Sequence, residues 1–359
     1  MLETPALYAA LPTVEVDGEE SPMLSTSVLS AMTEETRDGL YRCEVVFGNW
    51  GPVRGNLGYV YSDRSLLDFG AGFAVRMGEG NKAATVFAGS ITGIEEHYPR
   101  DRAPELVVLA EDRLQDLRMT RRTRTFEDVS DEDVIGQLAS EHGLQTDIDI
   151  DGPTYRTLAQ LNQSDLAFIR ARARAVDAEV WVDGSRLSVK ARARRSDGRV
   201  RLRYGSNLHE VSILADLAHQ RTGVAVSGWD VAAKEPIQFE AGASVIQPEV
   251  DGPTTGPGVL EEAFGIRLEQ IVHHVPLASA EAQALAEAEF RRRSRSFVAG
   301  SGVGEGDGRI RPGSVVELTG LAPPFNGDYY VCEARHTYDG RQGYLTSFRI
   351  ERPWLGAAS

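Results

Sequence analysis

Residues 86–96 read "VFAGSITGIEE", and a second stretch, "PFNGDYYVCEA" at residues 324–334, repeats their pattern. Each stretch has Phe, Gly two positions later, and Glu after a five-residue gap. The matching residues are Phe87, Gly89 and Glu95 in the first stretch, and Phe325, Gly327 and Glu333 in the second. A glycine-bounded turn followed by such a run is typical of a β-strand.

The flanks of both stretches repeat as well. Gly72-x-x-Val75-x-Met77 precedes the first stretch, and Gly313-x-x-Val316-x-Leu318 precedes the second. Nineteen residues after each Phe, an apolar run begins, at 106–109 and at 344–348. Three blocks in the same order predict two copies of one β-rich unit, although the spacing between the first two blocks differs by three residues.

Length and composition limit the class of protein. A chain of 359 residues with 42% hydrophobic and 25% charged residues is typical of a globular protein with two or three domains. No apolar run approaches the roughly 18 residues that a membrane helix needs. The start, "MLETPALYAALP", does not resemble a signal peptide, so we expect synthesis in the cytoplasm and no membrane partner. Cys43 and Cys332 stand in no metal or redox spacing.

Charge is distributed unevenly along the chain. The net charge of -15 argues against a nucleic-acid binder, which would need a basic face. Residues 113–203, however, hold 17 Lys and Arg against 15 Asp and Glu. We therefore expect a middle domain of different character between two acidic flanks, and no specific nucleic-acid partner.

The pattern along the chain predicts three domains. We expect a first β domain over 1–104, an α+β domain over 105–200, and a second β domain over 201–359 with a connecting loop. Ser130 and Ser164 are expected to cap helices over 130–143 and 164–176, because serine caps precede amphipathic runs there. A third helix is expected at 279–297, followed by a flexible linker at 299–308.

Catalytic and metal-binding patterns fail in detail. "DIDIDG" at 147–152 opens like a calcium loop, but Leu158 stands where a bidentate Glu belongs. "GSGVGEG" carries no Lys and follows a helix, so it is not a phosphate loop. His273 and His274 are neighbours rather than an i, i+4 pair. We expect no catalytic residues, no cofactor and no metal.

Several segments resemble the phage late control protein D family, which includes the hub part of VgrG. Gln163-Ser164-Asp165-x-x-Phe168-Ile169 is similar to that family's landmark motif, and residues 121–144 resemble the segment before it. "LRYGSNLHEV" (202–211), "VSGWD" (226–230) and residues 310–348 resemble later landmarks. The ordered series covers most of the chain.

This resemblance implies a non-enzymatic baseplate hub of a contractile phage tail or contractile injection particle. The fold is then mainly β with an α+β insertion, and two related tube-type β-barrel domains per chain form a pseudo-six-fold ring as a homotrimer. The implied partners are a separate trimeric spike, a hexameric tube or tube-initiator ring, and baseplate wedge components. Because the chain ends at "ERPWLGAAS", we expect the spike on another chain, although a longer protein cut short would read identically.

The two copies differ in aromatic content. The second has Tyr329, Tyr330, Tyr338 and Tyr344 where the first has Ile91, Thr92, Arg100 and Leu106. Aromatic residues are favoured at interfaces, so these tyrosines are candidates for the spike or subunit contact. Two alternatives to the hub remain: a tail-tip cell-wall hydrolase, and an adhesin or cargo-binding module.

Overall fold

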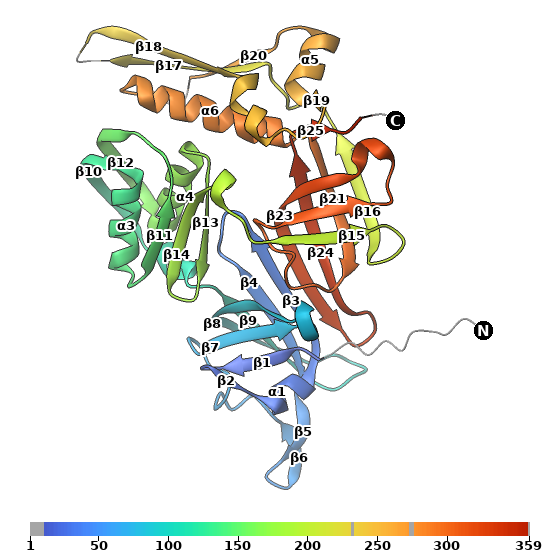
Figure 1. Ribbon diagram of the computed structural model, residues 1–359. Helices are drawn as coiled ribbons and strands as arrows, with labels where there is room; N and C mark the ends of the chain where they lie inside the picture. The colour runs from blue at the N-terminus through green and yellow to red at the C-terminus, as the bar shows by residue number, and fades with distance from the viewer. Residues whose placement is uncertain (1–10, 231–232, 273–275, 358–359) are drawn as a thin grey trace.

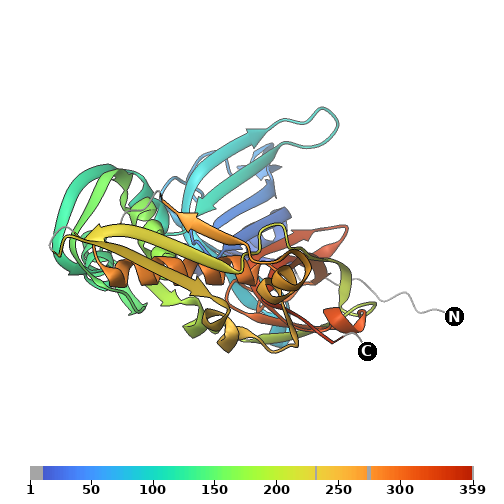
Figure 2. The same ribbon diagram turned by 90° about the horizontal axis from the view of Figure 1, so that it is seen from above.

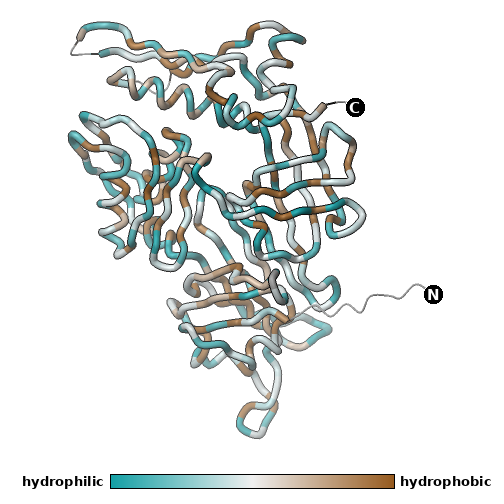
Figure 3. Tube along the Cα trace, in the orientation of Figure 1, coloured by the Kyte–Doolittle hydropathy of each residue, from teal (hydrophilic) through white to brown (hydrophobic). Residues whose placement is uncertain are grey.

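The computed structural model describes residues 11–230, 233–272 and 276–357 and is mainly β (Figure 1). Four hydrophobic cores divide it into four units: two halves of one long sheet, an α+β unit beside them, and a small sheet covered by a helix. Figure 3 shows hydrophobic stretches in each unit. The expected histidine pair, His273 and His274, lies outside the described residues.

The first half of the long sheet has its own core. Its strands are β1 (Thr13–Val16), β2 (Glu19–Glu20), β3 (Val28–Thr36), β4 (Arg42–Gly48), β7 (Gly72–Met77), β8 (Ala84–His97) and β9 (Glu105–Glu111). Helix α1 (Pro22–Ser27) and the hairpin of β5 (Trp50–Val53) and β6 (Asn56–Tyr59) accompany them. Strands alternate buried and exposed residues, as in Arg42–Gly48, which is the period expected of a sheet with one covered face.

The second half has the same plan. Its strands are β15 (Arg199–Arg203), β16 (Leu208–Ala215), β21 (Val298–Glu305), β22 (Val315–Thr319), β23 (Gly327–Asp339) and β24 (Gly343–Arg352). The order β16-β21-β24-β23-β22 repeats the order β3-β4-β9-β8-β7. The copies differ at one end, since β1 runs antiparallel to β7 whereas β15 runs parallel to β22.

The two halves also share their pairing register. Three pairs of β8 with β9 recur in β23 with β24: Ser90–Glu111 and Tyr330–Glu351, Ile91–Ala110 and Val331–Ile350, Gly93–Leu109 and Glu333–Arg349. A bulge lies after the second pair in both halves. A second shared irregularity lies between Val28 and Ser30 in β3, and between Leu208 and Glu210 in β16. Bulges are specific local features, so two at the same places indicate equivalent strands.

This register corrects the residue-by-residue match from the sequence. The blocks around Gly72, Phe87, Gly89 and Glu95 and around Gly313, Phe325, Gly327 and Glu333 do lie on or beside equivalent strands. However, Gly89 corresponds to Tyr329, because Phe73 pairs with Gly89 as Val316 pairs with Tyr329. Glu333 corresponds to Gly93 rather than to Glu95. Phe87 is buried, whereas Phe325 is half-buried in a turn before β23.

The middle unit is α+β. It contains α2 (Leu114–Arg118), β10 (Arg121–Ser130), α3 (Asp131–Glu141), β11 (Gln145–Asp149), β12 (Thr154–Ser164), α4 (Asp165–Ala175), β13 (Ala178–Asp183) and β14 (Arg186–Ala191). Ser130 and Asp133 form a capping box at α3, and the Ser164 side chain caps α4, as the sequence predicts. Strand β9 precedes this unit but pairs with β4 and β8, so the first half reaches residue 111, past the expected boundary at 104.

A small unit is inserted between β16 and β21. Strands β17 (Gly223–Asp230), β18 (Glu235–Gly242) and β20 (Leu268–Ile271) form a sheet, and α6 (Ser279–Arg295) lies along it (Figures 1 and 2). Helix α5 (Gly256–Phe264) and the pair of β19 (Thr254–Thr255) with β25 (Trp354–Leu355) join this unit to the second half. Ala282, Ala286 and Phe290 of α6 are buried against the sheet.

The expected flexible linker at 299–308 is wrong, because most of it is strand β21. Three glycines of this strand lie against neighbouring groups too closely for a side chain. A Cβ at Gly302 would lie 2.7 Å from the Phe348 ring, and a Cβ at Gly300 would collide with the Ser212 carbonyl. Glycine is therefore a packing requirement here and not a sign of flexibility.

Candidate functional site

The two sheet halves meet where β23 pairs with β3. We call this pairing the internal seam; it runs from Glu333 opposite Thr36 to Asp339 opposite Ser30. It makes the two halves one continuous sheet. The seam therefore shows how one copy of the repeated unit binds the next.

An aromatic side chain crosses the internal seam. Tyr338 of β23 lies opposite Ala31 of β3 and is 7% exposed, within the core of the first half. The Tyr344 hydroxyl lies 2.8 Å from Nδ1 of His336, a fully buried residue two positions before Tyr338. Burial lowers the pKa of His336 to about 3, so its imidazole is neutral at pH 7.

Ion pairs strengthen the same seam. Arg335 of β23 and Arg42 of β4 both bind Glu34 of β3, at 2.5 Å and 2.6 Å. The neighbouring carboxylate, Glu35, is fully buried and binds Arg311. Burial raises the pKa of Glu35, and the positive charge of Arg311 opposes that shift. A buried carboxylate needs such a partner, so Arg311 fixes the segment before β22 against β3.

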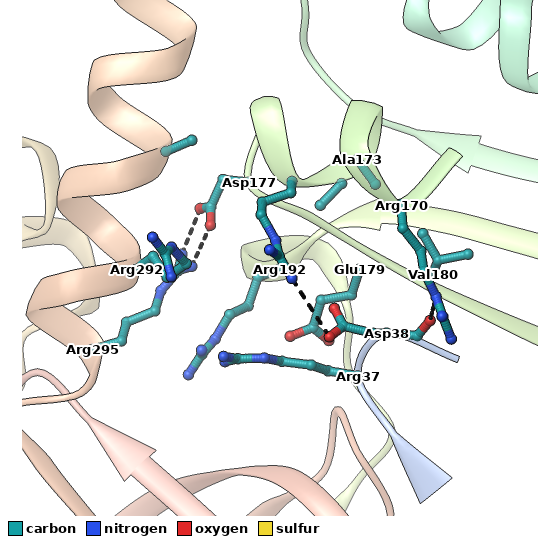
Figure 4. A pocket seen from close by; sticks show the side chains of 13 residues that line it. Arg37, Asp38, Arg170, Ala173, Asp177, Glu179, Val180, Arg192, Arg292 and Arg295 are labelled. Carbon is teal, nitrogen blue, oxygen red and sulfur yellow. Dashed lines mark hydrogen bonds and ion pairs between the residues drawn. The ribbon is translucent and has the colours of Figure 1, made fainter. Parts of the chain in front are cut away.

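A second ion-pair network joins the units around a pocket (Figure 4). Arg37, from the loop after β3, and Arg192, which follows β14, both bind Glu351 of β24. Burial alone would raise the pKa of Glu351, but the charges of Arg192 and Arg37 lower it to about 2. Arg295 at the end of α6 binds Asp177 at 2.5 Å and Glu249 at 2.6 Å. These pairs connect the middle unit, both sheet halves and α6.

The arginines around this pocket have partners within the chain. Its buried arginines bind carboxylates of the chain itself, and Arg170 donates to the Asp38 and Gly39 carbonyl oxygens at 2.6 Å and 2.9 Å. Within residues 11–230, 233–272 and 276–357, no group of three or more His, Cys, Asp or Glu could hold a metal ion. The network therefore has a structural explanation, which is the orientation of the units.

The four candidate interface tyrosines need correction, because their side chains are used inside the chain. Tyr329 is 1% exposed, and Tyr338 is in the internal seam. Tyr330 donates to Glu179 of β13 at 2.5 Å, and Tyr344 is half-buried beside His336. Several exposed aromatic residues were not singled out from the sequence, and three of them form a cluster in which Tyr59 contacts both Trp50 and Tyr98.

Two strand segments lack, among the described residues, a partner strand that their counterparts in the other half have. The β8 segment Gly93–His97 pairs with β9 on one side only, whereas the equivalent part of β23 also pairs with β3. Strand β16 pairs only with β21, whereas the equivalent β3 has partners on both sides. We call these segments the two open edges. No single sequence motif marks these open edges, but an alignment of the first half of the chain with the second could have located them.

Known structures share this fold. A prophage MuSo2 43 kDa tail protein from Shewanella oneidensis has a TM-score of 0.69 and 12% identity, over 96% of this chain and 98% of that one. A tail protein from Neisseria meningitidis MC58 has a TM-score of 0.66 and 13% identity, over 97% and 98%. The E. coli c3393 protein, described as a component of the type VI secretion system, has a TM-score of 0.58 and 12% identity, over 96% and 79%.

The fold is therefore that of phage tail proteins and of related proteins of a secretion system. A family model described as "Alg8 N-terminal domain" matches residues 12–339, and the chain belongs to this family. No curated protein matches the chain in sequence. Among the described helices, none has the length and apolar character needed to cross a membrane.

Proposed function

We propose that the protein is the structural baseplate hub of a contractile phage tail or contractile injection particle. The observation that carries this proposal is the repeated unit, with one strand order, one register and the same bulges in both halves. Each half is one tube-type β-barrel domain. Three chains then supply six similar units around a channel, and the homotrimer matches a six-fold tube at one end and a three-fold spike at the other.

The descriptions of the known structures that share this fold support the assignment. Two are tail proteins, and a third is a component of the type VI secretion system that is described as similar to T4 tail proteins. Two further structures that share the fold, at 8% identity, are Francisella PdpA-VgrG complexes. We infer a hub of the late control protein D and VgrG type, with a trimeric spike, a hexameric tube ring and baseplate wedge components as partners.

The hub acts by position rather than by chemistry. The middle unit lies on the outside of the ring, where it can hold neighbouring baseplate parts without narrowing the channel. The protein is made in the cytoplasm, assembles into the particle and carries out no reaction. The ion pairs of Arg295 and Glu351 hold the middle unit and α6 in fixed positions against the sheet, as a force-bearing adaptor requires.

Measurement of mass in solution tests the trimer. We expect a species of three 39.2 kDa chains after size-exclusion chromatography with light scattering. Negative-stain images of that species should show a ring of six similar densities with three-fold symmetry. A chain that stays monomeric at high concentration, with no ring in the images, would refute the proposal.

A further inference from the structure

The open edges of β8 and β16 are equivalent to the two strands that pair in the internal seam. The internal seam joins β23 to β3, and the shared register makes β8 the counterpart of β23 and β16 the counterpart of β3. Each chain therefore contains one completed junction between repeated units and the two separate sides of another. A second copy of this chain can complete that second junction, because each copy carries both of its sides.

We propose that β8 of one chain pairs antiparallel with β16 of a neighbouring copy, in the register of the internal seam. This inference rests on the proposed ring and adds the residues that close it. In the internal seam Arg335 lies opposite Glu34, and Tyr338 lies opposite Ala31. The counterparts are Glu95 opposite Leu214 of the neighbour, and Tyr98 opposite Val211 of the neighbour. Gly93 then faces Asp216 at one end of the pairing.

Exposure at four positions agrees with this assignment. Tyr98 is 61% exposed, whereas its counterpart Tyr338 is 7% exposed in the internal seam. Ala31, Thr33 and Glu35 are buried in β3, and their counterparts in β16 are only half-buried. The counterparts are Val211, Ile213 and Ala215. Residues at equivalent positions are thus buried where a partner strand is present and more exposed where it is absent.

The chemistry of the open edges is that of an interface. Leu214 on β16 is 64% exposed, and it stands where the internal seam has Glu34. Beside the β8 edge, Tyr98 contacts Tyr59, and Tyr59 contacts Trp50, at ring distances of 5.9 Å and 5.3 Å. Exposed aromatic and aliphatic side chains next to an unpaired strand would favour aggregation unless another strand covers them.

The internal seam and the proposed second seam differ in their residues, and this difference makes the symmetry of the ring three-fold rather than six-fold. The internal seam has the ion pair of Arg335 with Glu34, whereas the proposed second seam has no ion pair at that position, because Glu95 lies opposite Leu214. Six junctions alternate between these two kinds, so the ring has three-fold symmetry. Because β8 binds β16 rather than itself, the contact is head to tail, and it closes as a ring of three when each contact turns the next chain by one third of a full turn.

Cysteine cross-linking tests the register. We expect the double variant Glu95→Cys with Leu214→Cys to form covalent trimers on a non-reducing gel after mild oxidation, and no larger species. Glu95→Cys with Ser212→Cys, which is shifted along β16 by two residues, should cross-link at least about fivefold less, because diagonal neighbours are ~7–8 Å apart. Each single variant and the native protein, with its Cys43 and Cys332, serve as controls.

Mass measured under reducing conditions separates this inference from the proposed function. A trimer that cross-links in the shifted pair, or in neither pair, overturns the register and leaves the hub intact. A monomer that never cross-links overturns both. As a second test, Tyr98→Ser should weaken self-association by about tenfold or more while leaving the circular dichroism spectrum unchanged, and Tyr98→Phe should retain it. Equal association of Tyr98→Ser and the native chain would contradict the proposed seam.

Discussion

The fully buried carboxylate of Glu35 accepts two hydrogen bonds from the guanidinium of Arg311, at 2.5 Å and 2.8 Å. The pair joins the first half of the sheet to the second, across a long stretch of sequence. Removal of one partner from a buried ion pair leaves an uncompensated charge and costs about 3–5 kcal/mol. Arg311→Ala should therefore lower the free energy of unfolding by that amount in urea titrations.

Arg335→Ala is the matched control. Arg335 binds Glu34 in the same seam, but its side chain is 47% exposed, so the loss should be about 0–1 kcal/mol. Equal losses in the two variants would show that burial of Glu35 does not govern the strength of this junction.

His336 predicts a dependence of stability on pH. Its pKa is about 3 in the folded protein, below the usual histidine pKa of 6.5, so the unfolded chain binds the proton more readily in the range between them. Stability contributed by neutral His336 is present above pH 6.5 and is lost as the pH falls toward 3, with a slope of up to about 1.4 kcal/mol per pH unit. The check is urea unfolding at several pH values between 7 and 4. His336→Gln should show a shallower slope, and an unchanged slope would disprove this role.

Two glycines predict opposite effects. Gly302→Val should destabilise the protein by about 1–3 kcal/mol, because a side chain there collides with the Phe348 ring. Gly136→Ala should stabilise it by up to about 1 kcal/mol, because Gly136 lies within helix α3 with open space around its Cα. Thermal unfolding of both variants is the measurement. A neutral Gly302→Val would mean that β21 tolerates a side chain at its central position.

A turbidity assay on purified peptidoglycan separates the hub from a tail-tip hydrolase. We expect no clearing by the protein at concentrations where lysozyme clears the suspension within minutes. Clearing that disappears in a variant of the pocket, for example in Glu179→Gln, would instead favour the hydrolase.

Local signals in the sequence predicted local structure well. The caps at Ser130 and Ser164 place α3 and α4 correctly, because a capping side chain binds backbone within its own turn. The repeated blocks also identified equivalent strands. The match by residue identity was shifted by two positions, because the register is set by strand pairing and burial, as at Gly93 and Glu333.

Long-range features could not be predicted in the same way. The glycines of β21 looked like a linker, since their role depends on Ser212 and Phe348, which are distant in sequence. The tyrosines expected at the surface are buried or half-buried by contacts within the chain, such as that of Tyr330 with Glu179 of the middle unit. The exposed residue at the open edge, Tyr98, stands out only when its position is compared with that of Tyr338.

The central claim is that this chain adapts a six-fold tube to a three-fold spike. It is tested by co-expression with the spike protein of the same particle, followed by size-exclusion chromatography with mass detection. We expect a complex of three hub chains and three spike chains. A hub that remains monomeric and does not bind the spike would contradict it.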